Sequence, residues 1–171
     1  MNADYVGELG MNAEQRALLA DAASLGDAVT RLAANDEHQA ALSLLARHMA
    51  KPYAIGWAAA CMKAAGFSDD DADAVACVDE WLAGQDESVR RRAAALAADR
   101  EYASAGAWLA AAAGWSGGSL APDGEAEVPP PDYLYALASA GAVGMSIAQD
   151  PERFDALFAD CVSRGLEIVE T

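Results

Sequence analysis

Residues 115–131 read WSGGSLAPDGEAEVPPP, and they form the one long stretch of this chain that cannot be helical. The paired glycines at 117 and 118 and the three prolines at 129–131 rule out regular secondary structure there. On both sides, apolar residues recur at the three-to-four-residue spacing of amphipathic helices, and no segment shows the strict alternation of a half-buried strand. The sequence therefore predicts an all-α protein with one long loop, residues 115–131.

Capping residues, prolines and glycines divide the rest of the chain into seven to eight helices. Asn12, followed by Gln15, matches a capping box, and Asp150-Pro151 matches a cap followed by a first-turn proline. We expect a loosely ordered N-terminus over 1–11 and a single compact helical domain over 12–171. Within it, the expected helices cover 12–34 with a bend near Gly26, 36–51, 52–66, a segment from 68, 86–100, 104–114, 131–149 and 150–165, before a short tail at 166–171.

Two packing arrangements remain open at this point. The run from Tyr53 to Trp57 is weakly repeated by the run from Tyr102 to Trp108, about 50 residues later, which is a spacing typical of stacked helical hairpins. Alanine-rich sequence also produces such similarity, so a single helical bundle is the simpler prediction. Short connections after the second helix favour antiparallel neighbours. Small residues in the seventh helix permit close packing within the chain or across a weak homodimer: Ala136, Ala140, Gly141 and Gly144.

Composition and charge limit the classes of partner. The formal net charge is −16, which opposes binding to nucleic acid or to anionic lipid. No segment has the roughly 20 apolar residues that span a bilayer, and the start lacks the pattern of a signal peptide. The three cysteines, Cys61, Cys77 and Cys161, lie on separate predicted helices, as expected for buried thiols in a reducing compartment. These features predict a cytoplasmic protein that binds other proteins.

No residue pattern predicts catalysis, a metal or a cofactor. His38 and His48 are ten positions apart on one predicted helix and face different directions, so they cannot share a metal ion. His48 lies on the apolar face and is predicted to be a hydrogen-bonded core histidine. The acidic run at 69–71 follows Ser68 and is expected to cap a helix rather than to bind calcium. We therefore predict a protein that is not an enzyme.

Arg90, Arg91 and Arg92 form the one basic cluster. Asp86 and Glu87 precede Arg90 and Arg91 by four residues, a spacing that predicts surface ion pairs. The alternative is that one arginine turns inward and recognises a carboxylate or phosphate.

The long loop is the candidate partner-binding site. Three prolines favour an extended conformation that loses little entropy on binding, and aromatic residues flank the loop. The alternative is a structural strap that covers one end of the bundle, with Trp115 as part of the core. The candidate binding residues are Trp115, Ser116, Gly117, Gly118, Leu120, Pro122, Pro129, Pro130 and Tyr133.

The same region carries a family resemblance. Residues 107–110 (AWLA), 115–122 (WSGGSLAP) and 128–131 (VPPP), together with 57–59, 140–143 and 165–168, resemble a family of small helical bacterial proteins of unknown function. The similarity covers residues 37–170, and the WSGGSL-x-P segment is its most specific part. This chain departs from the family pattern by a longer acidic insert at 123–127.

Two functions follow as expectations. The resemblance implies an accessory, adaptor or chaperone role beside type VI or related secretion components, which makes a non-catalytic binding protein the leading hypothesis. The charge and small size support an alternative: an acidic immunity or antagonist protein that neutralises a basic partner. Binding that weakens steeply with salt would favour the alternative.

Overall fold

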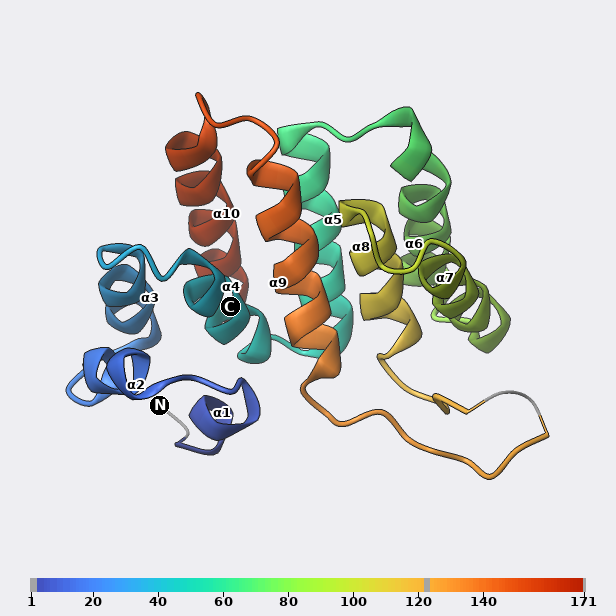
Figure 1. Ribbon diagram of the computed structural model, residues 1–171, viewed down its shortest axis with the longest axis horizontal. Coiled ribbons are helices and arrows are strands. Elements are labelled where there is room, and N and C mark those ends of the chain that lie inside the picture. The colour runs from blue at the N-terminus through green and yellow to red at the C-terminus, as the bar shows by residue number, and fades with distance from the viewer. Residues whose placement is uncertain (1–2, 122–123, 171) are drawn as a thin grey trace.

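The protein is all-helical, as predicted. A computed structural model describes residues 3–121 and 124–170, none of which lies in a strand (Figure 1). The described part contains ten α-helices and one 3-10 turn: α1 (Ala3–Glu8), α2 (Ala13–Leu19), α3 (Leu25–Ala33), α4 (His38–Arg47), α5 (Lys51–Ala65), η1 (Asp69–Asp71), α6 (Ala72–Gly84), α7 (Glu87–Asp99), α8 (Ala105–Gly114), α9 (Leu134–Ile147) and α10 (Phe154–Val169).

The N-terminal region differs from the prediction in two ways. We expected residues 1–11 to be loosely ordered, but Ala3–Glu8 forms α1. The helix expected over 12–34 is two helices, because the Ser24 side chain accepts a hydrogen bond from the backbone N–H of Asp27 and begins a new helix there. The predicted capping box at Asn12 is confirmed, with both of its bonds to Gln15 at 2.9 Å.

The C-terminal helix also begins and ends later than expected. Asp150-Pro151 lies in a turn, and α10 starts at Phe154 rather than at Pro151. Gly165 does not end the helix, which continues to Val169. Gly165 is buried against Leu45 of α4, where an added Cβ would overlap the leucine side chain. This glycine therefore permits a close approach between helices rather than a chain reversal.

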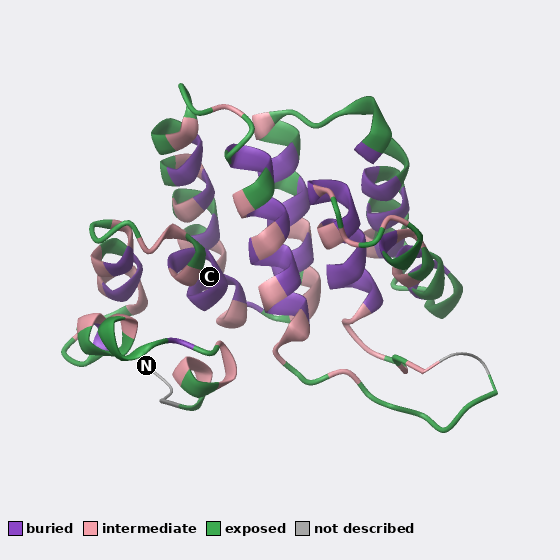
Figure 2. Ribbon diagram, in the orientation of Figure 1, coloured by how far each residue is buried: buried purple, intermediate pink, exposed green. Residues whose placement is uncertain are grey.

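Two alanine-rich helices form the centre of the molecule. α9 packs against α4, α5 and α8, and α8 packs against α6 and α7 on its other sides. Every residue of α8 except Trp108 is buried (Figure 2). Small side chains allow this, since a Cβ on Gly114 would lie 2.8 Å from the Cα of Ala94 in α7. The small face of α9 is likewise used within the chain, with Gly141 against the ring of Trp108.

The possible helical-hairpin repeat is not present as two equivalent pairs. α7 and α8 pack along their lengths, whereas the backbones of α4 and α5 do not run closely side by side and both helices pack along α9. The prediction that short connections make consecutive helices antiparallel neighbours is therefore wrong for α4 and α5. The reason is that α9, from much later in the chain, provides the apolar surface that both helices bury.

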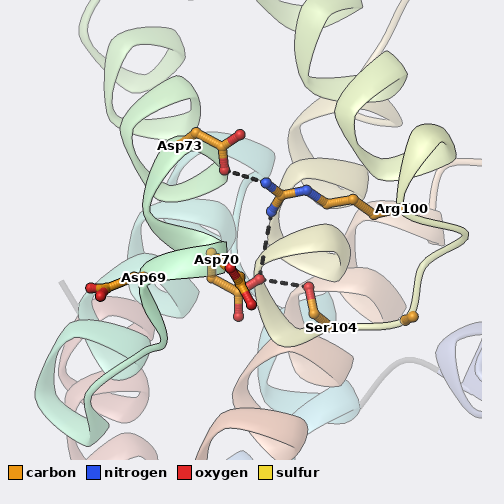
Figure 3. A pocket seen from close by; sticks show the side chains of 7 residues that line it. Asp69, Asp70, Asp73, Arg100 and Ser104 are labelled. Carbon is orange, nitrogen blue, oxygen red and sulfur yellow. Dashed lines mark hydrogen bonds and ion pairs between the residues drawn. The ribbon is translucent and has the colours of Figure 1, made fainter.

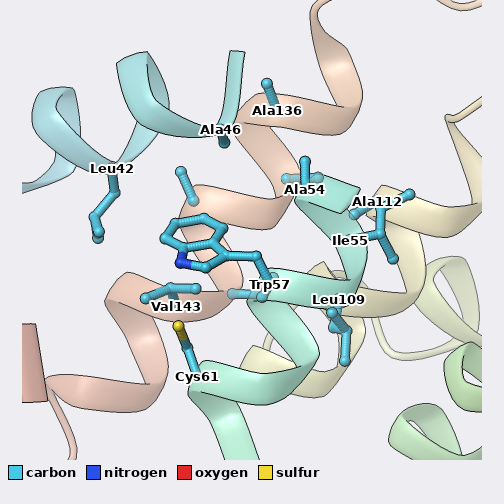
Figure 4. Close-up of a cluster of buried hydrophobic side chains, with 14 of the residues drawn as sticks. Leu42, Ala46, Ala54, Ile55, Trp57, Cys61, Leu109, Ala112, Ala136 and Val143 are labelled. Atoms are coloured by element: carbon cyan, nitrogen blue, oxygen red, sulfur yellow. The ribbon is translucent and has the colours of Figure 1, made fainter. Parts of the chain in front are cut away.

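The large residues of the core gather around Trp57 of α5. Figure 4 shows its indole beside Leu42 of α4 and Val143 of α9. The indole Nε1–H donates to the backbone carbonyl of Cys161 at 2.8 Å, which fixes α10 to the bundle. In the part of the chain that the structure describes, no helix has the length and apolar character needed to cross a bilayer.

Candidate functional site

The long loop begins from an aromatic anchor at the end of α8. Trp115 is half-buried and packs against two other aromatic rings, with centroid distances of 5.5 Å to Tyr102 and 6.1 Å to Trp108. Tyr102 comes from the turn between α7 and α8, and Trp108 from the one half-exposed position of α8. The first candidate residue therefore contributes to packing and fixes the direction in which the loop leaves the bundle.

A buried arginine fixes the end of α8, from which the loop starts, and lies close to Gly118. Arg90 of α7 is 5% exposed, and its guanidinium donates to the carbonyl oxygen of Gly114, the last residue of α8. Its Nε and Nη2 donate to the two carboxylate oxygens of Glu87 at 2.6 and 2.8 Å. Gly118 has φ of +64°, and a Cβ there would collide with the Arg90 guanidinium. Only glycine fits this position without strain.

This arrangement confirms the predicted ion pair of Glu87 with Arg91 and corrects the predicted pair of Asp86 with Arg90. Glu87, rather than Asp86, pairs with Arg90, and it also accepts from Arg91 at 3.0 Å. Hydrogen bonding from Arg90 is the main cause that lowers the pKa of Glu87 to about 2. Asp86 instead caps α7 by accepting from the backbone N–H groups of Ser88 and Val89. One arginine does turn inward, but its described partners belong to this chain.

The middle of the loop is closed by one backbone–backbone hydrogen bond and two hydrogen bonds to the side chain of Ser119. The N–H of Leu120 donates to the carbonyl of Val128 at 2.8 Å, and the hydroxyl of Ser119 accepts from the N–H groups of Ala121 and Val128. Leu120 and Val128 are 42% and 50% exposed, so this closure presents two apolar side chains to solvent. Glu125 and Glu127 are exposed between them in sequence. The candidate Pro122 lies outside the described residues.

The loop returns to the bundle through Asp132. The Asp132 carboxylate pairs with Lys51 at 2.8 Å and with Arg47 at 3.7 Å, and hydrogen bonding from Lys51 lowers its pKa. Of the remaining candidates, Pro129 is exposed, whereas Pro130 and Tyr133 are half-buried. Each end of the loop is therefore bound to the body by charged side chains from helices that lie far away in sequence.

A cleft of about 260 Å³ lies at the base of the loop. Three of the predicted residues, Ser116, Gly117 and Gly118, line it together. The helices contribute residues that the sequence did not single out as site residues: Lys51, Pro52, Trp81, Gln85 and Glu87, beside Arg90. Gln85 has a left-handed backbone with φ of +50°, an unusual conformation outside glycine. No local sequence motif predicts that these residues line the cleft, because only tertiary packing brings them to the loop.

A second hollow lies at the acidic run, at the opposite end of α6. It measures about 550 Å³ and is shown in Figure 3. The side chain of Ser68 makes no capping bond, so the predicted cap is not formed, and residues 69–71 form η1 ahead of α6. Asp71 is 2% exposed and accepts from the Ser104 hydroxyl at 2.6 Å, while Arg100 pairs with both Asp71 and Asp73.

This acidic network has a structural purpose. Ser104 also accepts from the N–H of Ala107 and thereby caps α8, so Asp71 connects η1 to the start of the central helix. A Cβ on Gly106 would overlap the Asp71 side chain, which shows how closely the two elements meet. Among the described residues, no group of three or more histidine, cysteine or acidic side chains is arranged to hold a metal ion.

The fold and the loop together define an all-helical protein with an extended loop that is fixed at both ends. The chain belongs to a family of unknown function, DUF6931, whose sequence model matches residues 28–169. The expected membership of an uncharacterised family is thus confirmed. No curated protein and no solved structure matches the chain.

Proposed function

We propose that this is a non-catalytic binding protein and that the closed loop is its partner-binding surface. The observation that carries the proposal is the closure at Leu120 and Val128, which holds two exposed apolar side chains in one fixed arrangement. Such preorganisation lowers the entropy lost on binding. Anchors at both roots support the same interpretation: Arg90 and Trp115 hold the start of the loop and the ion pair of Asp132 with Lys51 holds its end, which an unconstrained loop would not need.

Charge indicates the chemistry of the partner. The exposed residues between the two apolar side chains include Glu125 and Glu127, and the whole chain carries a net charge of −16. A partner surface that combines an apolar patch with basic residues would complement this loop. Apolar contact would provide affinity, and the acidic residues would speed association and limit the choice of partner.

The test is an affinity capture from cells that naturally make the protein, with the full chain as bait. Leu120→Asp/Val128→Asp keeps the backbone closure and replaces both apolar side chains, so the captured partner should be lost. Tyr53→Asp is the matched control, because Tyr53 is 65% exposed on α5 and belongs to a different surface. Equal capture by the wild type and the loop variant would refute a binding role for the loop.

The role as an accessory, adaptor or chaperone of a type VI-like secretion system is the more detailed form of this proposal, and it is supported by the family resemblance of residues 115–122. It is tested by the identity of the protein that wild type captures and the loop variant does not. A secretion component or effector retained at high salt supports it.

The alternative function is an acidic immunity or antagonist protein, favoured by the net charge. It predicts that a basic partner is captured at low salt and released as the ionic strength rises, because exposed charges are screened over about 8 Å at physiological salt. Replacing Glu125 and Glu127 with glutamine should then weaken capture more than replacing Leu120 and Val128.

A further inference from the structure

Two of the three cysteines come together between α5 and α10. Cys61 lies on α5 and Cys161 on α10, and their exposed fractions are 0% and 1%. The two helices pack against each other and run in opposite directions (Figure 1). Trp57, one turn before Cys61, donates its indole N–H to the backbone carbonyl of Cys161. The face of α5 that binds α10 through Trp57 therefore also carries Cys61, as Figure 4 shows.

The register of this antiparallel pair brings the two cysteines to the same level. A groove of about 480 Å³ between the helices is lined by residues within 52–60 of α5 and within 164–168 of α10. Because the helices are antiparallel, the end of the α5 stretch, Ala60, lies nearest the start of the α10 stretch, Arg164. Cys61 directly follows Ala60, and Cys161 lies about one turn before Arg164. The two cysteines therefore face each other just beyond the end of the groove.

The two thiols interact directly. A hydrogen bond between them lowers the pKa of Cys161, and the same contact, together with burial, raises the pKa of Cys61. The pKa of Arg164 is raised mainly by its hydrogen bond to Asp160, and both thiols add to this effect. The pair therefore lies within electrostatic reach of the arginine that lines the groove.

We propose that Cys61 and Cys161 are a redox-active pair, which a hydroperoxide oxidises to an intramolecular disulfide between α5 and α10. The native fold has already brought together two thiols that are 100 residues apart in the chain. Because both are buried, only a small oxidant that enters when the edge helix α10 loosens reaches them.

The chemistry balances with one molecule of hydrogen peroxide. The Cys161 thiol loses its proton, and its sulfur attacks one peroxide oxygen. The S–O bond forms as the O–O bond breaks, and the released hydroxide takes that proton and leaves as water. The Cys61 sulfur then attacks the sulfur of the sulfenic acid, so that the S–S bond forms and the S–O bond breaks. The departing hydroxyl takes the Cys61 proton as a second water, and the two sulfurs have given two electrons to the peroxide.

The disulfide fastens the last helix to the bundle. α10 lies at the edge of the molecule, and α5 is its main neighbour (Figure 1). A cross-link between residues 100 positions apart restricts the unfolded chain strongly. We therefore expect the oxidised protein to have a Tm roughly 4–16 °C above that of the reduced protein.

The test uses the full chain, first reduced and then exposed to hydrogen peroxide under native conditions. The remaining thiols are alkylated, and tryptic peptides are analysed by mass spectrometry without reduction. Trypsin places Cys61 in peptide 48–63 and Cys161 in peptide 154–164, so the disulfide appears as one species that contains both. We expect this species to be the main product, with an increase in Tm that a reductant reverses.

Cys77 is the matched control within the same chain. It lies on α6 with an exposed fraction of 5%, slightly above that of either paired cysteine, and its thiol donates to the carbonyl of Val89 at 3.9 Å. Cys77→Ser should form the disulfide and gain thermal stability as wild type does. Cys61→Ala should form no intramolecular disulfide and gain none.

The wild-type protein alone can contradict the proposal. It is overturned if all three thiols of the folded protein can still be alkylated after oxidation, or if Cys77 reacts before the pair. A disulfide between two chains, detected on a non-reducing gel as the main product, also overturns it. A link between Cys61 and Cys161 that leaves Tm unchanged or lowers it refutes the fastening of α10.

Discussion

Replacing Arg90 with methionine should destabilise the protein far more than the same change at Arg91. Both arginines lie on α7 and both pair with Glu87, but the side chain of Arg90 is 6% exposed and that of Arg91 is 51% exposed. Methionine retains most of the apolar stem and removes the guanidinium. The comparison therefore isolates what the buried guanidinium does.

The magnitude follows from the groups left behind. Gly114 is buried, so its carbonyl oxygen would lose its arginine partner at a cost of about 1–3 kcal/mol. Glu87 is half-exposed and keeps Arg91, so the lost ion pair adds at most about 1 kcal/mol. We expect a loss of about 1–4 kcal/mol for Arg90→Met, or a decrease in Tm of roughly 2–16 °C at this chain length. Arg91→Met should stay within about 0.5 kcal/mol of wild type.

Two assays check this reasoning. Urea denaturation gives the free energy of unfolding of both variants, and an unchanged m-value shows that the change is one of stability. Limited digestion with a glutamate-specific protease reports on the loop, where Glu125 and Glu127 are exposed, and Arg90→Met should be cut faster under native conditions. If the two variants are equally stable and are cut at the same rate, the arginine does not hold the loop.

Three further predictions concern the same region. Gly114→Ala should destabilise the protein by about 1–3 kcal/mol in thermal unfolding, because its Cβ would meet Ala94, whereas Gly117→Ala, with no atom within 4 Å, should be nearly neutral. The pKa of Glu87 is lowered from 4.5 to about 2, so the ionised carboxylate contributes fully to the free energy of unfolding above pH 4.5 and loses this contribution as the pH falls toward 2. After allowance for solvent screening the contribution is about 1 kcal/mol. The stability difference between wild type and Glu87→Gln should therefore shrink between pH 4.5 and pH 2. Gln85→Gly should raise stability by about 1 kcal/mol by relieving the left-handed backbone, and a Gln85→Ala variant that is equally stabilised would show that strain is not the cause.

The fold class could be predicted from the sequence because local signals and tertiary packing agree over most of the chain. Ser104, Asp86 and Asn12 cap helices as their residue types suggest, and each makes the expected side-chain bond. The errors occur where tertiary packing decides the outcome. Gly165 marks a helix end in isolation, yet Leu45 packs against it and the helix continues. The order of packing was equally hidden, since α4 and α5 both pack against α9, which the chain forms only after α6, α7 and α8.

The loop was visible in the sequence, but the groups that hold it were not. Its glycines and prolines identify it without reference to anything else, because they act on the local backbone. Arg90 meets Gly114 across 24 residues, and Arg47 meets Glu8 across 39, so no helical spacing could reveal either contact. Because the chain carries a net negative charge, the sequence alone suggests that both arginines are solvated charges on the surface. Buried arginines in such a chain each need a specific acceptor, because an unpaired guanidinium is costly to bury. Their locations therefore mark two of the places where segments distant in sequence are fixed to each other: α7 to the end of α8 at Gly114, where the loop begins, and α4 to the N-terminal helix at Glu8.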